Sequence, residues 1–314
     1  MAITLALLSA ACDVLTVVGY NDVGSNGKRC GPAAPLLACD QAACVVQEMG
    51  PARVGSTAVG VDDDFAYFFR SATDLSRMPI EGGDSVDLAT TNEYSMQMAV
   101  DEHHVYWTLS SNEVWRVPKA GGAAERVLEV FGHPTTIALD DTHVYVALTD
   151  SNQLVMAPKK PGKATLLSGQ TAPLGLATDA DYVYWVNQGS GGDGQIMRAP
   201  LGDLADPEVL ASQLNAPALL TLGAAQIYFT AGTELFELDK QGGKPRAVLD
   251  GLGETKGLVA FSDSVYISGM NGLQRFRDGK ATLLEARPVL ALAAGCSGVV
   301  ATIWFESGLI RFSP

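Results

Sequence analysis

The sequence is poor in charged residues, and especially in basic ones. Asp, Glu, Lys and Arg make up 18% of its 314 residues, and 21 Lys and Arg stand against 35 Asp and Glu, for a formal net charge of -14. Lys and Arg form no stripe or cluster, whereas binding to the phosphates of nucleic acid requires one. We therefore expect no nucleic-acid partner.

Sequence signatures of common catalytic sites are also missing. There is no G-x-S-x-G motif, no H-E-x-x-H motif and no Cys/His arrangement with local support for a nucleophile. With four histidines in the chain, candidates for a general base are few. These absences favour a non-catalytic binding or interaction module over an enzyme.

The N-terminal hydrophobic stretch is short. Ile3 to Ala11 cannot span a bilayer, and it ends in the small residues that signal peptidase requires, although no Lys or Arg precedes it. We interpret residues 1–11 as a signal peptide. The sequence LSAAC resembles a bacterial lipobox, with Leu8 one place further from the cysteine than usual. This resemblance implies that Cys12 is lipidated and that the protein is a periplasmic or outer-membrane-anchored lipoprotein, in contact with membrane only through the anchor. Ordinary secretion is the first alternative, and an uncleaved anchor or an intracellular chain is the second.

Residues 12–43 read as a tether, because they are rich in Gly, Ala, Pro and Asn and show no periodicity. Besides Cys12 the chain has four cysteines, an even number that suits disulfides in an oxidising compartment. The disulfide candidates are Cys30, Cys39, Cys44 and Cys296. Three pairings exist, of which we favour Cys296 with Cys30 or Cys39. A metal site formed by the four thiols is the rival interpretation, although no CxxC pair supports it.

From residue 44 onward the sequence repeats itself. A ten-residue signature, seen in MAVDEHHVYW and IALDDTHVYV, occurs seven times. Its aromatic position falls at Tyr67, Tyr106, Tyr145, Tyr184, Tyr228 and Tyr266, with Val300 in the seventh copy, so the spacing stays near 39 residues. A period in this range indicates a repeat architecture.

Within each unit the hydrophobic pattern has the period of a β-strand. In the third unit, Thr136–Leu139, Val144–Leu148, Leu154–Ala157 and Ala164–Leu167 are short strand-like runs separated by Gly, Pro and Asp. Four strands in each of seven units of about 40 residues predict an all-β fold, a single seven-bladed β-propeller over residues 44–314. A β-sandwich or an open solenoid explains the constant period less well.

The ring must also close. The seventh unit supplies only three strands, and the run Cys44–Met49 lies just ahead of the first inner strand. We predict that it completes the last blade, which removes an unpaired sheet edge.

Four equivalent aspartates end the inner strands of the first four units: Asp62, Asp101, Asp140 and Asp179. They could bind a calcium or magnesium ion, since carboxylate oxygens suit these cations, but their equivalence favours a structural role in the turn. We predict no other cofactor. His104 and His143 occupy matching turn positions and receive the same structural interpretation.

We expect ligand-binding residues on the opposite face. His133 precedes an inner strand, and the glycine-rich loop Asn187–Gln195, with Asn187 and Asp193, is the most unusual connection of the chain. Glu254, Lys256 and Arg287 precede inner strands or lie near them, and strand geometry places them on the same face. A flexible hairpin loop is the alternative interpretation of residues 187–195.

The repeated motif resembles the YWTD and NHL propellers. Val105-Tyr106-Trp107-Thr108 with Gly121-Gly122, and Val183-Tyr184-Trp185-Val186 with Ile196-Met197-Arg198, carry the resemblance. It implies the propeller fold over residues 50–314, with exported bacterial lipoproteins of unknown role as the nearest relatives, and it carries over no catalytic residue. YWTD domains have six blades, whereas this chain has seven units.

We therefore expect a monomer that binds a protein or a small-molecule ligand without transforming it. The alternative is a metal-dependent lyase or lactonase-type hydrolase, with a metal at the channel mouth held by residues such as His133 and Glu254.

Overall fold

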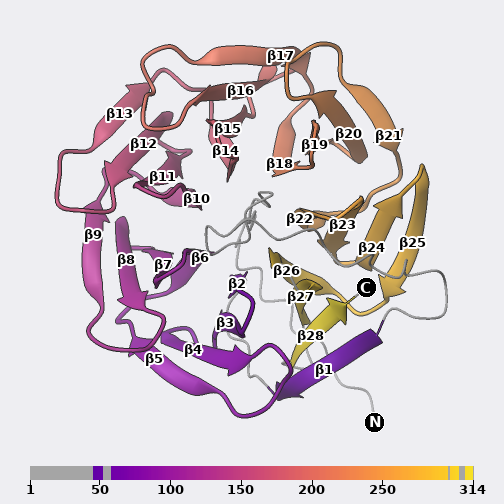
Figure 1. Ribbon diagram of the computed structural model, residues 1–314. Coiled ribbons are helices and arrows are strands. Elements are labelled where there is room, and N and C mark those ends of the chain that lie inside the picture. Colours follow the sequence, from indigo (N-terminus) through magenta and orange to yellow (C-terminus); the bar gives the residue numbers. More distant parts are fainter. Residues whose placement is uncertain (1–44, 52–57, 296–297, 304–307, 314) are drawn as a thin grey trace, which may run out of the picture.

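The protein is a ring of seven four-stranded antiparallel sheets (Figure 1). The computed structural model describes residues 45–51, 58–295, 298–303 and 308–313. All regular elements among these residues are strands, and no described helix is long and apolar enough to cross a membrane. The prediction of a seven-bladed, all-β propeller is confirmed.

Each of the first six blades uses four consecutive strands, from the channel outward. Blade 1 consists of β2 (Val59–Val61), β3 (Phe65–Phe69), β4 (Asp74–Pro79) and β5 (Val86–Thr90). Blade 2 consists of β6 (Ser95–Val100), β7 (His104–Leu109), β8 (Glu113–Pro118) and β9 (Glu125–Glu129). Blade 3 consists of β10 (Pro134–Leu139), β11 (His143–Leu148), β12 (Gln153–Pro158) and β13 (Thr165–Ser168). Blade 4 consists of β14 (Pro173–Thr178), β15 (Tyr182–Asn187), β16 (Gly194–Pro200) and β17 (Glu208–Leu214). Blade 5 consists of β18 (Pro217–Leu222), β19 (Gln226–Ala231), β20 (Glu234–Asp239) and β21 (Arg246–Leu249). Blade 6 consists of β22 (Thr255–Phe261), β23 (Ser264–Gly269), β24 (Gly272–Arg277) and β25 (Lys280–Glu285).

Blade 7 joins the two ends of the described chain. It consists of β26 (Val289–Gly295), β27 (Gly298–Ile303), β28 (Gly308–Ser313) and, as its outermost strand, β1 (Val45–Pro51). β1 pairs antiparallel with β28, with Val46 opposite Phe312, and Met49 is buried against blade 1. The predicted closing strand is therefore confirmed: β1 covers the predicted run from Val45 to Met49 and continues to Pro51, while Cys44 lies outside the described residues.

The hydrophobic core is divided among the seams between blades. Seven buried clusters are found among the described residues, and each combines side chains of two neighbouring blades. Successive residues of a strand point to opposite sides of its sheet. Accordingly Tyr106 packs against blade 3 and Trp107 against blade 1, and Tyr184 and Trp185 divide in the same way between blades 5 and 3. The second strand of each of these two blades thus packs the blade against both neighbours.

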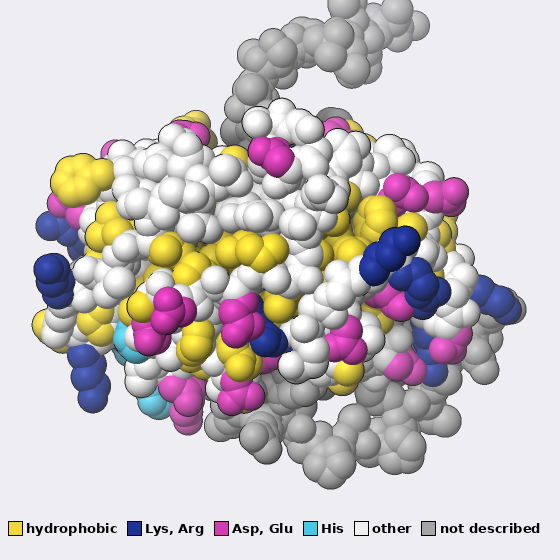
Figure 2. All heavy atoms as spheres, turned by 90° about the horizontal axis from the view of Figure 1, so that it is seen from above, with side chains coloured by type: hydrophobic (Ala, Val, Ile, Leu, Met, Phe, Trp, Pro, Cys, Tyr) yellow, Lys and Arg dark blue, Asp and Glu magenta, His cyan; other side chains and the backbone are white. Residues whose placement is uncertain are grey.

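The antiparallel order creates two distinct faces. Connections after the first and third strands of a blade lie on one face, which we call the Asp face. Connections after the second and fourth strands lie on the other, which we call the His133 face. On the rim seen in Figure 2, charged side chains gather mostly toward one face, and a band of hydrophobic side chains crosses the middle. The outermost strands expose Val86, Leu166, Val209 and Leu283.

Candidate functional site

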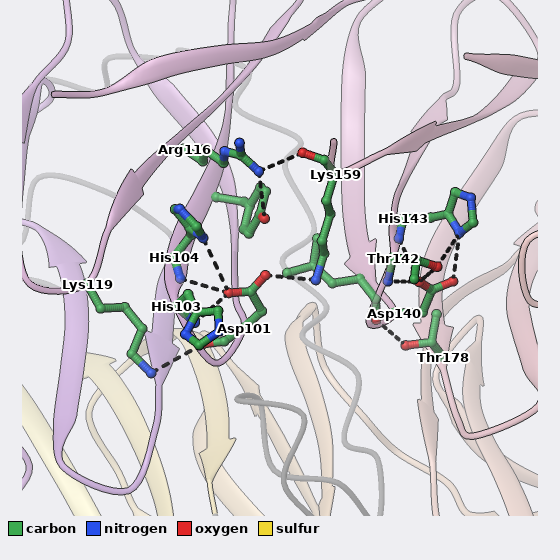
Figure 3. Close-up of polar contacts among 12 residues, drawn as sticks. Asp101, His103, His104, Arg116, Lys119, Asp140, Thr142, His143, Lys159 and Thr178 are labelled. Carbon is green, nitrogen blue, oxygen red and sulfur yellow. Dashed lines mark hydrogen bonds and ion pairs between the residues drawn. The ribbon is translucent and has the colours of Figure 1, made fainter. Parts of the chain in front are cut away.

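In blades 1 to 4, the repeated aspartates of the Asp face organise the turn that follows the inner strand (Figure 3). In blade 2, one oxygen of Asp101 accepts the backbone N–H groups of His103 at 2.8 Å and His104 at 2.7 Å. Asp62, Asp140 and Asp179 accept the corresponding N–H pairs in their own turns. Aspartate suits this position because its short side chain reaches backbone groups two and three residues ahead.

The second oxygen of three of these aspartates binds a lysine of the next blade. Lys159 Nζ lies 2.8 Å from Asp101 Oδ2, and Lys240 Nζ lies 3.1 Å from Asp179 Oδ2. Lys119 makes the same ion pair with Asp62. We call each such pair an Asp–Lys clamp. The ammonium groups occupy the place where a bound cation would have to lie, which supports the structural interpretation of the aspartates.

An arginine completes the clamp from the blade that carries the aspartate. Arg116 donates from a guanidinium N–H to the backbone carbonyl of Lys159 at 2.7 Å (Figure 3), and Arg198 does the same to Lys240 at 2.7 Å. Arg77 makes the equivalent bond to Lys119. The arginine holds the lysine backbone while the aspartate holds its ammonium, so the turn of one blade is fixed to the next at two points.

Blade 3 keeps the aspartate but lacks the clamp, because Met156 and Leu201 stand where the arginine and lysine would be. Asp140 accepts the Tyr145 hydroxyl at 2.6 Å, as Asp62 and Asp179 accept the tyrosine hydroxyls of their own blades. In blade 3 that hydroxyl oxygen also accepts the Gly202 N–H at 2.8 Å. Leu201 and Leu204 pack into the hydrophobic cluster of this seam. The lysine is therefore replaced by a hydrogen-bond relay and apolar packing.

Burial and hydrogen bonding or ion pairing shift the pKa of these carboxyl groups in opposite directions. Burial alone would raise the pKa of Asp101, but the Lys159 ammonium and the backbone N–H groups outweigh it and hold the pKa below its ordinary value. The pKa of Asp140 is also lowered, because the Tyr145 hydroxyl and the turn N–H groups outweigh burial. Burial and the nearby Asp101 raise the pKa of Tyr106. Both aspartates are thus ionised at neutral pH.

His104 and His143 are the first residues of β7 and β11, directly after the turns in which they were predicted. His104 is half-buried beside Tyr106, and burial lowers its pKa despite the nearby Asp101. His143 Nδ1 lies 2.8 Å from the Thr142 hydroxyl and 3.4 Å from Asp140. Across the described part of the chain, no three side chains of His, Cys, Asp or Glu gather in a way that could hold a metal ion.

The His133 face carries all six residues that the sequence singled out for ligand binding. His133 lies between β9 and β10, Asn187 and Asp193 flank the β15–β16 connection, and the rest lie at or near the start of inner strands. The six residues come from the connections of several different blades. Lys256 Nζ pairs with Glu254 at 2.6 Å, and Arg287 pairs with Glu285 at 2.8 Å.

The glycine-rich loop is ordered by its own aspartate. Asp193 accepts the backbone N–H groups of Ser190 at 2.7 Å and Gly191 at 3.2 Å, and Asp193 itself is exposed. Asn187 is buried and donates to the Gln170 side chain at 3.1 Å, which also accepts the Trp185 indole N–H at 2.9 Å. The Asp193 contacts close the connection between β15 and β16 on itself.

All five cysteines lie outside the described residues. The lipidation of Cys12 and every disulfide pairing therefore remain predictions. The same holds for the signal peptide and the tether.

Sequence reasoning missed two residues of the His133 face. Phe131 and Tyr94 are the most exposed large hydrophobic residues of the described chain, at 86% and 67%. Both lie at the end of blade 2, where Tyr94 precedes β6 and Phe131 follows β9. Their signal in the sequence was an aromatic residue in the connection before an inner strand, outside the repeated pattern.

One turn lies between these two aromatic residues. The Ser110 N–H donates to the Tyr94 carbonyl at 3.2 Å, and the Val130 N–H donates to the Asn112 carbonyl at 2.9 Å. Residues 110–112 form the β7–β8 turn, so Tyr94 and Phe131 flank it on the channel side and on the outer side. A Cβ on Gly132, at φ 149°, would lie 2.7 Å from Ser151 Oγ, which places the Phe131 connection against the β11–β12 turn of blade 3.

Comparisons with known proteins support the fold alone. No protein-family model and no curated protein matches the sequence. Among solved structures, the chain is similar to one in the crystal structure of a nidogen/laminin complex, with a TM-score of 0.57 and 19% identity over 70% of this chain and 90% of that one. It is also similar to a chain in the crystal structure of the mitotic checkpoint complex, with a TM-score of 0.67 and 12% identity over 86% of this chain and 93% of that one.

Proposed function

We propose that this protein is a non-catalytic module that binds another protein through the His133 face, at the end of blade 2. The observation that carries the proposal is the pair of exposed aromatic residues, Tyr94 and Phe131, on either side of the β7–β8 turn. Single exposed hydrophobic residues are ordinary on any protein. Two aromatic side chains flanking one turn form a compact surface, and aromatic residues are enriched in protein interfaces and their energetic centres.

The Asp face is the weaker candidate for a binding surface. Its lysines and aspartates satisfy one another, as in the clamp of Lys159 with Asp101, and breaking such pairs to bind a partner would cost free energy. The two solved structures described above are protein complexes, which agrees with a binding role at the level of the fold.

A photo-reactive amino acid tests this placement. We would introduce benzoylphenylalanine at position 131 and, as the control, at position 166, where Leu166 is 53% exposed on the outermost strand of blade 3. Illumination in cells of the source organism should give a discrete cross-linked protein from position 131 but not from position 166. Equal cross-linking at both positions, or none at 131, would overturn the proposal.

The partner should lie outside the cytoplasm. We propose that residues 1–11 direct export and that Cys12 carries the lipid, on the strength of the short apolar stretch and the lipobox-like LSAAC. Labelling with radioactive palmitate should mark the wild type and spare a Cys12→Ser variant. Label that stays on Cys12→Ser would contradict the anchor.

The metal-dependent enzyme of the alternative hypothesis requires a bound ion near His133 and Glu254. A specific ion raises the melting temperature, because it binds only the folded state. We expect calcium, magnesium and zinc to leave the melting temperature unchanged. A metal-dependent increase in the melting temperature that Glu254→Gln abolishes would support the enzyme hypothesis.

A further inference from the structure

The surface around Tyr94 and Phe131 has a pronounced negative charge. Its carboxylates outnumber its two arginines, Arg70 and Arg126. The ends of blades 1 and 2 and the facing turn of blade 3 contribute Asp74, Glu93, Glu113, Glu129 and Asp150, and Asp87 lies further along β5 within reach of Arg70. The whole chain carries a formal charge of -14, so the long-range field has the same sign.

The arginines are already engaged. Arg126 lies 2.7 Å from Glu113 and 3.2 Å from Glu129, and Arg70 lies 2.7 Å from Asp87. The Glu93 carboxylate accepts a hydrogen bond from the Ser110 hydroxyl at 3.1 Å, in the turn between the two aromatics. Among the described residues no Lys or Arg pairs with Glu93 or Asp150. Negative charge is therefore left over beside both aromatic side chains.

The spacing of the aromatics follows from the sheet. Tyr94 adjoins the innermost strand of blade 2 and Phe131 adjoins the outermost, so three strand spacings separate them, roughly 14 Å. An extended chain rises about 3.3 Å per residue, and four residues cover about 13 Å. Residues i, i+2 and i+4 of an extended segment also point the same way, which puts residue i+2 over the β7–β8 turn and Glu93.

We propose, on the basis of the binding function above, that the partner presents an extended segment with apolar side chains at positions i and i+4 and a Lys or Arg at i+2. The apolar side chains pack on Tyr94 and Phe131. The cation between them pairs with Glu93, a carboxylate that the fold supplies with no cation of its own. Because the pair is near solvent, its contribution decreases as salt screens it.

A random dodecapeptide library displayed on phage tests this chemistry. We would select on the immobilised wild-type protein after depleting the library on a Tyr94→Ala/Phe131→Ala double variant. The expected consensus has two apolar residues four apart with Lys or Arg midway. A synthetic peptide of this consensus should bind the double variant at least tenfold more weakly and Leu166→Ala with unchanged affinity.

A second measurement isolates the cation. The synthetic peptide with Glu in place of its central Lys should bind the wild type about tenfold more weakly, and Glu93→Gln should remove most of that difference. A consensus without a cation, a spacing other than four, or equal affinity for the Lys and Glu peptides would overturn the inference. If the peptide experiments give such a result but position 131 still cross-links a protein in cells, the proposed binding function is supported and only the proposed sequence of the bound segment is rejected. If both experiments fail, the binding function falls as well.

Discussion

Lys159 of blade 3 places its ammonium 2.8 Å from Asp101 Oδ2 of blade 2, across 58 residues of sequence. Both side chains are largely buried, at 11% and 16% exposed. The same relationship links Lys119 to Asp62 and Lys240 to Asp179. These clamps tie neighbouring blades together on the Asp face, whereas the aromatic pair proposed to bind the partner lies on the opposite face.

Breaking one clamp should destabilise the ring. Lys159→Met leaves the Asp101 carboxylate buried without its counter-charge, so we expect a loss of about 3 kcal/mol in the free energy of unfolding. Urea unfolding followed by tryptophan fluorescence measures it. Lys160→Met, at the exposed neighbouring position, is the control and should change the free energy of unfolding by less than about 0.5 kcal/mol. A similar result for both variants would show that the clamp contributes nothing.

The relay in blade 3 predicts a difference between two tyrosines. Tyr145→Phe leaves the Asp140 oxygen and the Gly202 N–H without their shared hydroxyl, and we expect a loss of about 2 kcal/mol in unfolding free energy. Tyr228 holds the same position in blade 5, but Gly223 replaces the aspartate there. Tyr228→Phe should therefore be nearly neutral, and comparable losses for the two variants would rule out the relay as the cause.

The lowered carboxyl pKa values predict a pH dependence. Because Asp62, Asp101 and Asp140 have pKa values below their ordinary value in the folded state, their stabilisation is complete above about pH 4, the ordinary value for aspartate. It is lost as the pH falls through the lower folded values. Urea unfolding at pH 6, 4 and 3 should show the steepest loss below pH 4, with a shallower loss for Asp101→Asn. An equal decrease in the free energy of unfolding with falling pH for the wild type and Asp101→Asn would show that Asp101 does not contribute to the pH dependence.

Closure of the ring can be tested by truncation. Removing residues 1–43 keeps β1 and should leave a folded protein with one cooperative melting transition. Removing residues 1–51 takes away β1, exposes the edge of β28 and uncovers the pocket of Met49. This shorter protein should melt at a clearly lower temperature or aggregate. Equal melting temperatures for the two truncations would mean that β1 does not hold the ring closed.

The repeat made the architecture predictable. The seven copies of the signature, which include the evenly spaced Tyr67, Tyr106, Tyr145 and Tyr184, revealed the number of blades. The missing fourth strand of the last unit pointed to the segment that became β1. Strand pairing within a blade is local in sequence, so alternation and turn residues are enough to predict it.

The candidate site was predictable only in part. Antiparallel order correctly placed His133, Asn187, Asp193, Glu254, Lys256 and Arg287 on one face. It could not show that Lys256 and Arg287 pair with neighbouring glutamates, or that Asp193 closes its own loop. The exposure of Tyr94 and Phe131 depends on how connections from different blades pack, and neither residue belongs to the repeated motif.

Affinity for the cross-linked partner tests the central claim most directly. Once the protein captured at position 131 is identified, its dissociation constant for the wild type can be compared with that for Tyr94→Ala/Phe131→Ala, with Leu166→Ala as the control. Removing two aromatic anchors should weaken binding by at least a hundredfold, or about 3 kcal/mol, at an unchanged melting temperature. A dissociation constant within twofold of the wild-type value would show that the end of blade 2 is not the binding surface.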